Sequence, residues 1–346
     1  MNKLTVLCDY KGFFGSKYNA NPYLSGFDNN ILDAAFRSLN YECNFIKMSE
    51  VQMLPLDECR NMKVVYTSIE DKGYFYKDFI EDIILYLAFS GADLIPSHWF
   101  LRANNNKVFM ELLGRVLLKL PVKLLESMVF GTYEEAMIAS ENLNYPVIVK
   151  EAKGAMSEGV FIAKNKIDFE NVVKKASRSK NIKNEVWEVG RSYKYDDYIK
   201  ESSFRNKFIV QNFIPGLNKD YKLLIFGDRY FIFERPTRKN DFRASGSGNK
   251  NYIYGSVVEL PSGLLNYAKE VFLQLNVPVL SLDIGYNDTD YYIFEFQVLF
   301  FGTVGHLKSD GYYIEQNTHW VFKYEKNDVE YDYACAIDWF LKNRKV

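Results

Sequence analysis

The sequence is poor in the side chains that usually hold transition metals. It has only three histidines among its 346 residues, namely His98, His306 and His319. Its four cysteines are scattered, without the paired spacing of a metal site, and they are Cys8, Cys43, Cys59 and Cys335. These scarcities predict a reduced, cytoplasmic protein in which any metal is a hard ion held by oxygen ligands.

Long apolar runs, low-complexity segments, internal repeats and an excess of one charge are also missing. No run of about 18 apolar residues could span a membrane, and the N-terminus lacks the pattern of a signal peptide. The 43 basic and 44 acidic residues give a net charge of −1, which argues against a nucleic-acid partner. The chain is long enough for two or three packed units.

Residues 1 to about 100 alternate between strand and helix patterns, which predicts a small parallel α/β sheet. Strands are expected at 4–10, 41–48, 61–69 and 92–96, and helices at 29–39 and 77–91. The second helix ends at Gly91, a common residue after a helix C-terminus. The glycines near positions 12 and 15 do not form a GxGxxG fingerprint, so no dinucleotide site is predicted there.

The rest of the chain mixes helices with antiparallel strands. Helices are expected at 107–120, 132–143, 262–276 and 328–343. Strands are expected at 145–152 and 159–164, in an antiparallel run at 207–214, 220–227 and 229–236, and in a hairpin that turns at 287–290. A lysine-rich, mostly polar stretch from 164 to 207 is expected to be partly helical.

The first motif with chemical meaning is a strand that ends in a lysine and is followed by a loop of small residues. Lys150 ends the apolar run 146–149, and the loop 151–159 contains Gly154, Ser157 and Gly159. A lysine at this place can reach phosphate oxygens, and small residues let backbone N–H groups approach them. Taken alone, the motif is more simply an ordinary hairpin with a polar turn. It is not a P-loop.

The second motif is a set of three oxygen donors on the predicted hairpin. Asp283 interrupts an apolar strand, and Glu295 and Gln297 lie two residues apart on the next one, so they share a face, with Phe294 and Phe296 on the other. If the register pairs Asp283 with Glu295, the three donors converge. Two carboxylates in an apolar setting favour a cation, and Mg²⁺ prefers oxygen ligands. An ordinary half-solvated strand face is the alternative.

The third motif is a cationic loop rich in glycine and serine. Arg235, Arg238 and Arg243 lie in or beside it, between the strands of the first motif and the hairpin. An arginine there could neutralise a transferring γ-phosphoryl group or bind a substrate carboxylate through two bonds. As an isolated feature, such a loop is more often simply solvated.

In this order and spacing, the motifs resemble the ATP-grasp superfamily from about Asn104 to Gly305. Lys107 and Lys150 look like the two nucleotide lysines of the family, and residues 209–216 look like the hinge that meets the adenine. Residues 220–222 resemble the D-x-R step of the family, with Lys in place of Arg. The nucleotide-binding residues that the resemblance implies are Lys107, Lys150, Gly154, Ser157, Gly159, Gln211, Asn212, Phe213, Ile214, Asp220 and Lys222.

The same resemblance implies the catalytic and metal-binding residues. The segment 241–245 is similar to the F-R-x-N loop of the family, so Arg243 inherits the role at the phosphate or acyl phosphate, with Arg235 beside it. Asp283, Glu295 and Gln297 resemble the Asp, Glu and Asn ligands of one or two Mg²⁺ ions. Gln for Asn keeps a carbonyl oxygen on a longer arm. The family often has Glu where this sequence has Asn212.

The resemblance also implies a fold of mixed α/β and α+β class. An N-terminal α/β domain (1–100) is expected to precede two α+β subdomains that clamp the nucleotide. The first of these subdomains (101–210) carries the glycine-rich loop and the lysine-rich insertion, and the second (211–346) carries the metal site.

The activity implied is an ATP- and Mg²⁺-dependent carboxylate–amine ligase that forms an amide through an acyl phosphate and produces ADP. Its substrates would be small-molecule, carbohydrate or peptide carboxylates and amines, as in the tailoring of a bacterial surface polysaccharide or peptide. The alternatives are an ATP-grasp kinase acting on a small acceptor and a degenerate nucleotide-binding module. Such ligases are often dimers, so a homodimer is also compatible. His98, Trp99 and Arg102 could face the cleft between domains, although structural roles are the simpler expectation for them.

Overall fold

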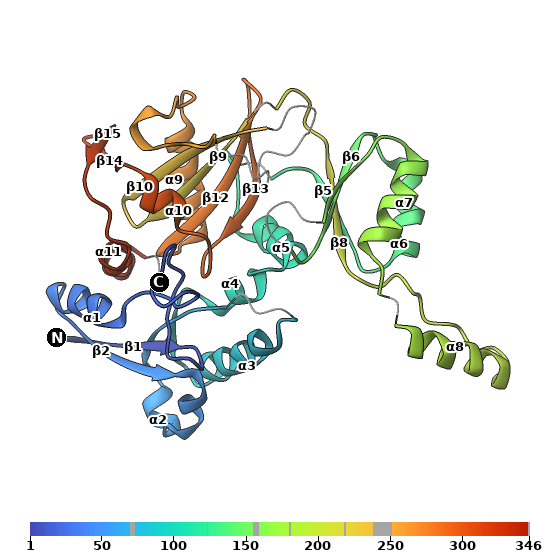
Figure 1. Cartoon of the computed structure of the whole chain (residues 1–346), viewed down its shortest axis with the longest axis horizontal. Coiled ribbons are helices and arrows are strands. Elements are labelled where there is room, and N and C mark those ends of the chain that lie inside the picture. The colour runs from blue at the N-terminus through green and yellow to red at the C-terminus, as the bar shows by residue number, and fades with distance from the viewer. Residues whose placement is uncertain are drawn as a thin grey trace.

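The computed structural model describes residues 1–69, 73–122, 124–154, 159–179, 181–217, 219–237 and 251–344. Three sheets organise these residues, one in each of three units, with the central unit set apart from the other two (Figure 1). In this described part of the chain, no helix is both long enough and apolar enough to cross a membrane.

The N-terminal domain is the predicted parallel sheet with helices. Its strands, in the order β2-β1-β3-β4, are β1 (Asn2–Cys8), β2 (Tyr41–Lys47), β3 (Lys63–Tyr66) and β4 (Asp93–Ile95). Its helices are α1 (Asn29–Ser38), α2 (Leu56–Cys59) and α3 (Phe75–Phe89), with the 3-10 helix η1 (Met48–Met53). Asp28 caps α1 by accepting from two backbone N–H groups, and Gly91, at φ +88, follows the end of α3.

The central subdomain is a four-stranded antiparallel sheet. Its order is β5-β8-β6-β7, with β5 (Ser127–Phe130), β6 (Val147–Glu151), β7 (Val160–Ala163) and β8 (Phe208–Asn212). The helices α6 (Tyr133–Ala139) and α7 (Lys166–Ala176) and the 3-10 helix η2 (Ser140–Asn142) accompany it. The prediction that residues 207–214 run antiparallel with 220–227 was wrong, because β8 pairs with β5 and β6 instead. Strand β5 was not predicted.

The third unit is a seven-stranded sheet covered on both faces. Along it lie β13 (Tyr291–Gln297), β12 (Val279–Tyr286), β9 (Lys219–Phe226), β10 (Arg229–Pro236), β14 (Gly311–Gln316) and β15 (His319–Tyr324), with β11 (Ile253–Tyr254) beside β10. Helix α9 (Leu264–Leu275) packs on one face, and α11 (Val329–Asn343) packs on the other. The shorter helices η3 (Gly255–Val257) and α10 (Val304–Lys308) complete this unit. The last two strands were not predicted.

Alternation along the strands decides which face each helix covers. In β9, Leu223 and Ile225 pack with α9, whereas Leu224 and Phe226 pack with α11. At the start of the strand, the α11 face changes from apolar to charged, because Asp220 and Lys222 follow the same alternation. The polar end of that face therefore lies beyond the apolar core that α11 covers.

Ion pairs fasten the N-terminal domain to this third unit. Glu330 on α11 accepts hydrogen bonds from Lys17 Nζ at 2.5 Å and from the backbone N–H of Asp28 at 2.9 Å. Arg344 binds both carboxylate oxygens of Asp93 at 2.6 Å each. These contacts fix the two units against each other.

The lysine-rich stretch is partly helical, as predicted. It contains α7 and a further helix, α8 (Ile182–Lys194), none of whose residues is buried. Figure 1 shows α8 projecting away from the rest of the molecule. Two more helices, α4 (His98–Ala103) and α5 (Lys107–Leu117), lead from the N-terminal domain into the central subdomain.

Candidate functional site

The predicted lysines and carboxylates come together where the central subdomain faces the seven-stranded sheet. Lys150 lies at the end of β6, and the charges that act on it include those of Glu295 on β13, Lys107 on α5 and Asp283 on β12. Helix α5 stands between the two sheets (Figure 1). Helix α5, strand β6 and the hairpin of β12 and β13, which are far apart in the sequence, therefore contribute to one site.

The hairpin of β12 and β13 has the register that the metal prediction required. Asp283 lies directly opposite Glu295, and Gln297 lies opposite Ser281. The amide of Gln297 donates from Nε2 to Glu295 Oε1 at 3.2 Å. Three oxygen-bearing side chains thus share one end of the sheet face, as the sequence predicted.

A β-bulge corrects the prediction for Phe294. The register shifts between Asp283 and Ile284, which pairs with Ile293, so Phe294 is the extra residue. Ile293 and Phe296 both join the core beside α9, which leaves Phe294 on the face of Asp283. There its ring blocks the space above Gly285 and lies 5.7 Å from Lys150 Nζ. Only Phe296 occupies the opposite face, as predicted.

Two basic side chains surround Asp283. Lys222, opposite it on β9, donates to Oδ1 at 2.8 Å. Arg235 on β10 lies 2.9 Å from Oδ2 and donates from Nε to Asp220 Oδ1 at 2.5 Å. Two cations and two carboxylates thus form one charge network, and Arg235 and Asp220 in it are only 5% and 6% exposed.

The pKa values of the two carboxylates in the network are shifted in opposite directions. Burial raises the pKa of Asp283, but Arg235 and Lys222 together outweigh burial and hold that pKa below its usual range. Burial is the larger effect at Asp220 and raises its pKa despite the contact with Arg235. Asp283 therefore keeps its negative charge over the physiological pH range.

Lys107 meets the small-residue loop from the other side. It is the first residue of α5, which Asn106 caps by accepting from Phe109 N–H at 3.3 Å. Its backbone N–H donates to Ala152 O at 2.9 Å, and its Nζ donates to Gly154 O at 2.5 Å. The start of the loop is therefore fixed against the helix N-terminus, where backbone dipoles favour an anion.

Lys150 is a half-buried lysine with a reduced proton affinity. Burial lowers its pKa to about 8, although the negative charge of Glu295 opposes the shift, and the positive charge of Lys107 lowers the pKa further. At the far end of the loop, Gly159 has φ +70, and its carbonyl accepts from Glu151 N–H at 2.8 Å. Both ends of the loop are therefore held by the hairpin of β6 and β7, next to the incompletely hydrated ammonium group of Lys150.

Glu111 is a site residue that the sequence analysis missed. It lies one helical turn after Lys107 and is only 5% exposed. It accepts from Gln211 Nε2 at 3.3 Å and from Ser127 Oγ at 2.5 Å, and its negative charge acts on Lys150. A glutamate four residues after a lysine in an otherwise apolar helix segment was the available signal.

The predicted hinge lies at the end of β8. Gln211 is 3% exposed, and its Oε1 is buried with no hydrogen-bond partner among the described residues. Asn212 is exposed and bonds Glu126 twice, from its backbone N–H to the carbonyl at 3.1 Å and from Nδ2 to the carboxylate at 2.8 Å. Ile214 is buried, and Phe213 is half-buried. The four residues are contiguous, but adenine binding by them stays a prediction.

Several predicted residues lie outside the described part of the chain. They are Ser157, Arg238, Arg243 and the rest of the segment 241–245. Among the described residues, no group of three or more His, Cys, Asp or Glu side chains could hold a metal ion. The predicted ligand set has two carboxylates and one amide, so substrate phosphates and water would have to complete it.

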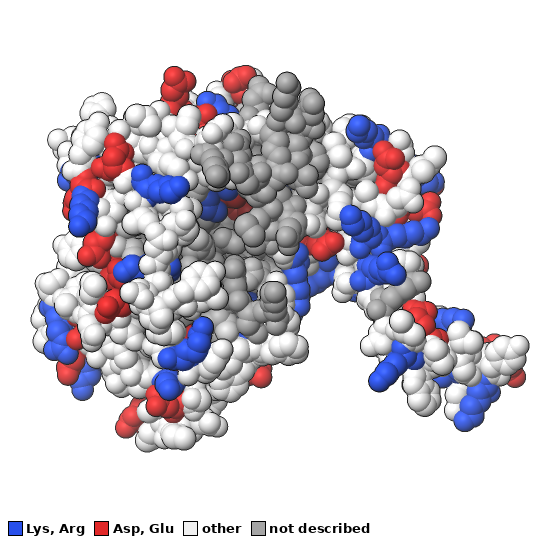
Figure 2. All heavy atoms as spheres, in the orientation of Figure 1, with Lys and Arg blue, Asp and Glu red and all other residues white. Residues whose placement is uncertain are grey.

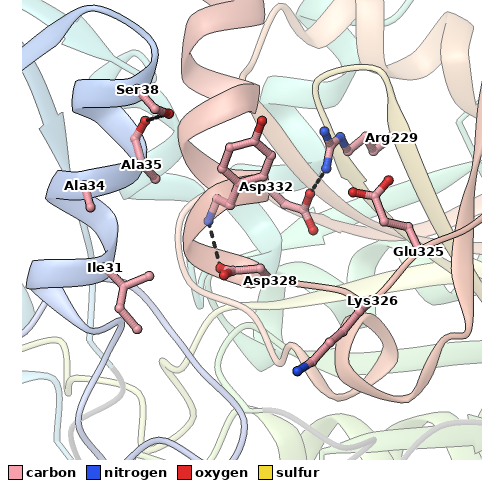
Figure 3. Close-up of a pocket in the computed structure, with 10 residues that line it drawn as sticks. Ile31, Ala34, Ala35, Ser38, Arg229, Glu325, Lys326, Asp328 and Asp332 are labelled. Atoms are coloured by element: carbon pink, nitrogen blue, oxygen red, sulfur yellow. Dashed lines mark hydrogen bonds and ion pairs between the residues drawn. The ribbon is translucent and has the colours of Figure 1, made fainter.

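A cavity of about 380 Å³ lies elsewhere, between α1 and the start of α11 (Figure 3). Ile31 and Ala34 line its α1 side, and Arg229 and Asp332 form an ion pair on its other side. Asp332 also contacts His306 Nε2 at 2.6 Å. These charges are satisfied within the protein, so this cavity is not the candidate site.

Comparisons with known proteins find a similar segment and similar folds. Residues 111–189 match the family described as carbamoyl-phosphate synthase L chain, ATP binding domain. The structure of D-cycloserine synthetase DcsG superposes with a TM-score of 0.53 and 11% identity, over 97% of this chain and 99% of that one. The ADP complex of purK, N5-carboxyaminoimidazole ribonucleotide synthetase, superposes with a TM-score of 0.51 and 11% sequence identity. The match covers 90% of this chain and 73% of that one. No curated protein matches at significant sequence similarity.

The structural likeness defines the fold of this protein. Its three-unit α/β and α+β architecture is the ATP-grasp fold, and residues 111–189 are similar to an ATP-binding domain. The match at 111–189 includes Glu111, Lys150 and the loop after it, whereas the carboxylate hairpin lies outside the match.

The charge network makes Asp283 a sensitive position for stability. We expect Asp283→Asn to lower the free energy of unfolding by about 2–3 kcal/mol, because it leaves Lys222 without its ion-pair partner and Arg235 with Asp220 alone in a largely buried place. Urea unfolding of the purified proteins would measure this. Asp288→Asn, in the exposed turn of the same hairpin, should stay within about 0.5 kcal/mol of wild type. Equal stability of the two variants would contradict the network.

Proposed function

We propose that this chain is an ATP- and Mg²⁺-dependent carboxylate–amine ligase that forms an amide bond through an acyl phosphate. The observation that carries the proposal is the meeting of two lysines with a carboxylate hairpin: Lys107 and Lys150 on one side, Asp283 and Glu295 in direct register on the other. The ATP-binding description of the matched family supports it.

The lysines fit the phosphates of a nucleotide. Lys150 lacks full hydration and is next to a loop that begins at a helix N-terminus, so an anion would restore its full charge. The adenine would lie against residues 211–214 at the end of β8. The buried, unpartnered Oε1 of Gln211 is an acceptor that a donor from a ligand could satisfy.

The carboxylate hairpin fits one or two magnesium ions by the chemistry of its donors. Glu295 and Gln297 would hold the ion, with Asp283 contributing charge while Lys222 and Arg235 hold it in place. When bound, Mg²⁺ supplies neutralisation of phosphate charge as it develops. Because two carboxylates bind Arg235, we propose that its role is to position Asp220 and Asp283. We propose that Arg243 contacts the transferred phosphoryl group.

The reaction then needs positioning and charge stabilisation rather than a protein nucleophile. An oxygen of the substrate carboxylate attacks the γ-phosphorus, and ADP leaves. The amine attacks the acyl carbon, inorganic phosphate leaves, and the amine proton passes to the phosphate or to water. We propose small-molecule, carbohydrate or peptide substrates and a cytoplasmic location.

Nucleotide binding is the first expected outcome. Calorimetric titration of ADP with Mg²⁺ should show binding to the wild type, weakened about 10- to 100-fold in Lys150→Ala, because a charged hydrogen bond to phosphate is lost. Lys164→Ala removes an exposed lysine just after β7 and should bind like wild type. Wild-type protein that binds no nucleotide, with or without Mg²⁺, would refute the proposal.

The lowered pKa of Lys150 predicts how binding depends on pH. Phosphate favours the charged lysine, so the ADP affinity of the wild type should fall as the pH rises through about 8, by nearly tenfold for each further unit. An arginine stays charged throughout, so Lys150→Arg should flatten the profile. Titrations between about pH 7 and about pH 9.5 test this. Parallel slopes in the two proteins would assign the titration to another group.

Product analysis tests the ligase chemistry itself. With ATP, Mg²⁺ and pools of carboxylates and amines, we expect ADP, free phosphate and an amide, whereas a kinase would leave a phosphorylated acceptor. Glu295→Gln should slow turnover about 10²–10³-fold by removing a charge at the metal. Asp288→Asn serves as the control from the same hairpin. Full activity in Glu295→Gln would show that the metal assignment is wrong.

A further inference from the structure

A second group of basic side chains lies at the junction of the N-terminal domain and the central subdomain. We call it the junction cluster, and it consists of Lys77 on α3, Arg102 on α4, Lys153 after β6 and Lys207 just before β8, together with Glu81 on α3. Lys150 and Lys107 of the proposed nucleotide site do not belong to it.

Direct contacts hold the cluster together. Glu81 accepts from Lys77 through one oxygen and from Arg102 Nη1 at 3.0 Å through the other. On the central subdomain, Ala152 N–H donates to Lys207 O at 3.3 Å, which places Lys207 beside the strand that leads to Lys153. Lys153 in turn lies over a ring of the N-terminal domain, because its Nζ is 4.3 Å from the ring centre of Tyr74.

The positive charge of the cluster exceeds its negative charge. Both oxygens of Glu81 are taken by Lys77 and Arg102, and no ion pair of Lys153 or Lys207 with a carboxylate is found among the described residues. Burial lowers the pKa of Lys207, and the positive charges of Arg102 and Lys153 lower it further. Cations held close together against their repulsion indicate a place for an anion.

The cluster adjoins the proposed phosphate loop from the side of the N-terminal domain. Lys153 immediately precedes Gly154, whose carbonyl accepts from Lys107. Trp99 lies one turn before Arg102 on the same side of α4 and is 52% exposed. An anionic group bound here would therefore sit beside the nucleotide phosphates with an aromatic surface next to it. Figure 2 shows basic side chains gathered on the central subdomain where it meets the rest of the molecule.

We infer that the junction cluster is an anion-binding site for the substrate, and that it takes a phosphate or carboxylate group through Arg102, Lys153 and Lys207. The inference rests on the proposed ligase function only in calling the anion a substrate group. It gives Arg102 a binding role instead of the structural role that is the simpler expectation from sequence. It also separates a substrate subsite from the nucleotide lysines Lys107 and Lys150.

The test uses inorganic phosphate and malonate as probes, each titrated into the full chain with and without saturating ADP and Mg²⁺. Lys207→Gln and Arg102→Gln should each weaken binding of the preferred anion about tenfold, with ADP affinity and melting temperature unchanged. Lys200→Gln, an exposed lysine on the same connecting segment, should bind like wild type. A preference for phosphate or for malonate identifies the group.

Three outcomes would overturn the inference. The first is equal anion affinity in wild type and all three variants. The second is an equal loss in Lys200→Gln, which would indicate general screening of charge. The third is a parallel loss of ADP affinity in Lys207→Gln and Arg102→Gln, which would assign the cluster to the nucleotide. A wild type that binds the anion but no ADP would refute the ligase proposal and leave this inference standing.

Discussion

The arrangement of the site depends on one constraint, which is that the charge of Asp283 must be balanced inside a mostly apolar sheet. Lys222 supplies part of the balance from the adjacent strand β9, and Arg235 supplies the rest from β10, the next strand beyond it. Burying a carboxylate without a partner is costly. A shift in the register of these strands would therefore either expose Asp283 to solvent or bury it without its basic partners. The apolar alternation that packs α9 and α11 on opposite faces requires the same register, so packing and electrostatics specify the same alignment.

The bulge on β13 changes which side chains of that strand face the candidate site. A regular strand would place Phe294 and Phe296 together and Glu295 opposite them. The extra residue lets Ile293 and Phe296 both fill the core, while Phe294 and Glu295 share the open face. Phe294 then lies near Lys150 of the central subdomain, with its ring centre 5.7 Å from Nζ. An apolar ring next to that lysine excludes water, which is consistent with its lowered pKa.

Much of this could be read from the sequence, and the failures have physical causes. The parallel N-terminal sheet, the lysine hairpin and the pairing of Asp283 with Glu295 follow from periodicity and turn residues, which are local signals. The sheet to which β8 belongs is decided by pairing with β5 and β6, which are distant in sequence. The bulge at Phe294 breaks the period of two without a glycine on its strand to mark it. The spacing of Glu111 from Lys107 was a local signal, but its contact with Gln211 joins positions that are distant in sequence.

The basic and the acidic side chains of the site belong to different units of the protein. The nucleotide lysines and the loop belong to the central subdomain and α5, whereas the carboxylates belong to the seven-stranded sheet, which is fastened to the N-terminal domain through α11. Helix α5 joins the two sides, because Met110 and Leu113 pack in the core of the seven-stranded sheet. The backbone N–H of Phe296 donates to Met110 Sδ at 3.4 Å, and Leu124 forms a bridge with Ile293. A ligand that carries negative phosphates together with a cation is complementary to both sides at once. Its binding would therefore neutralise the lysines and the carboxylates at the same time, which is charge complementarity that the protein side chains do not supply by direct ion pairs between Lys150 and the hairpin among the described residues.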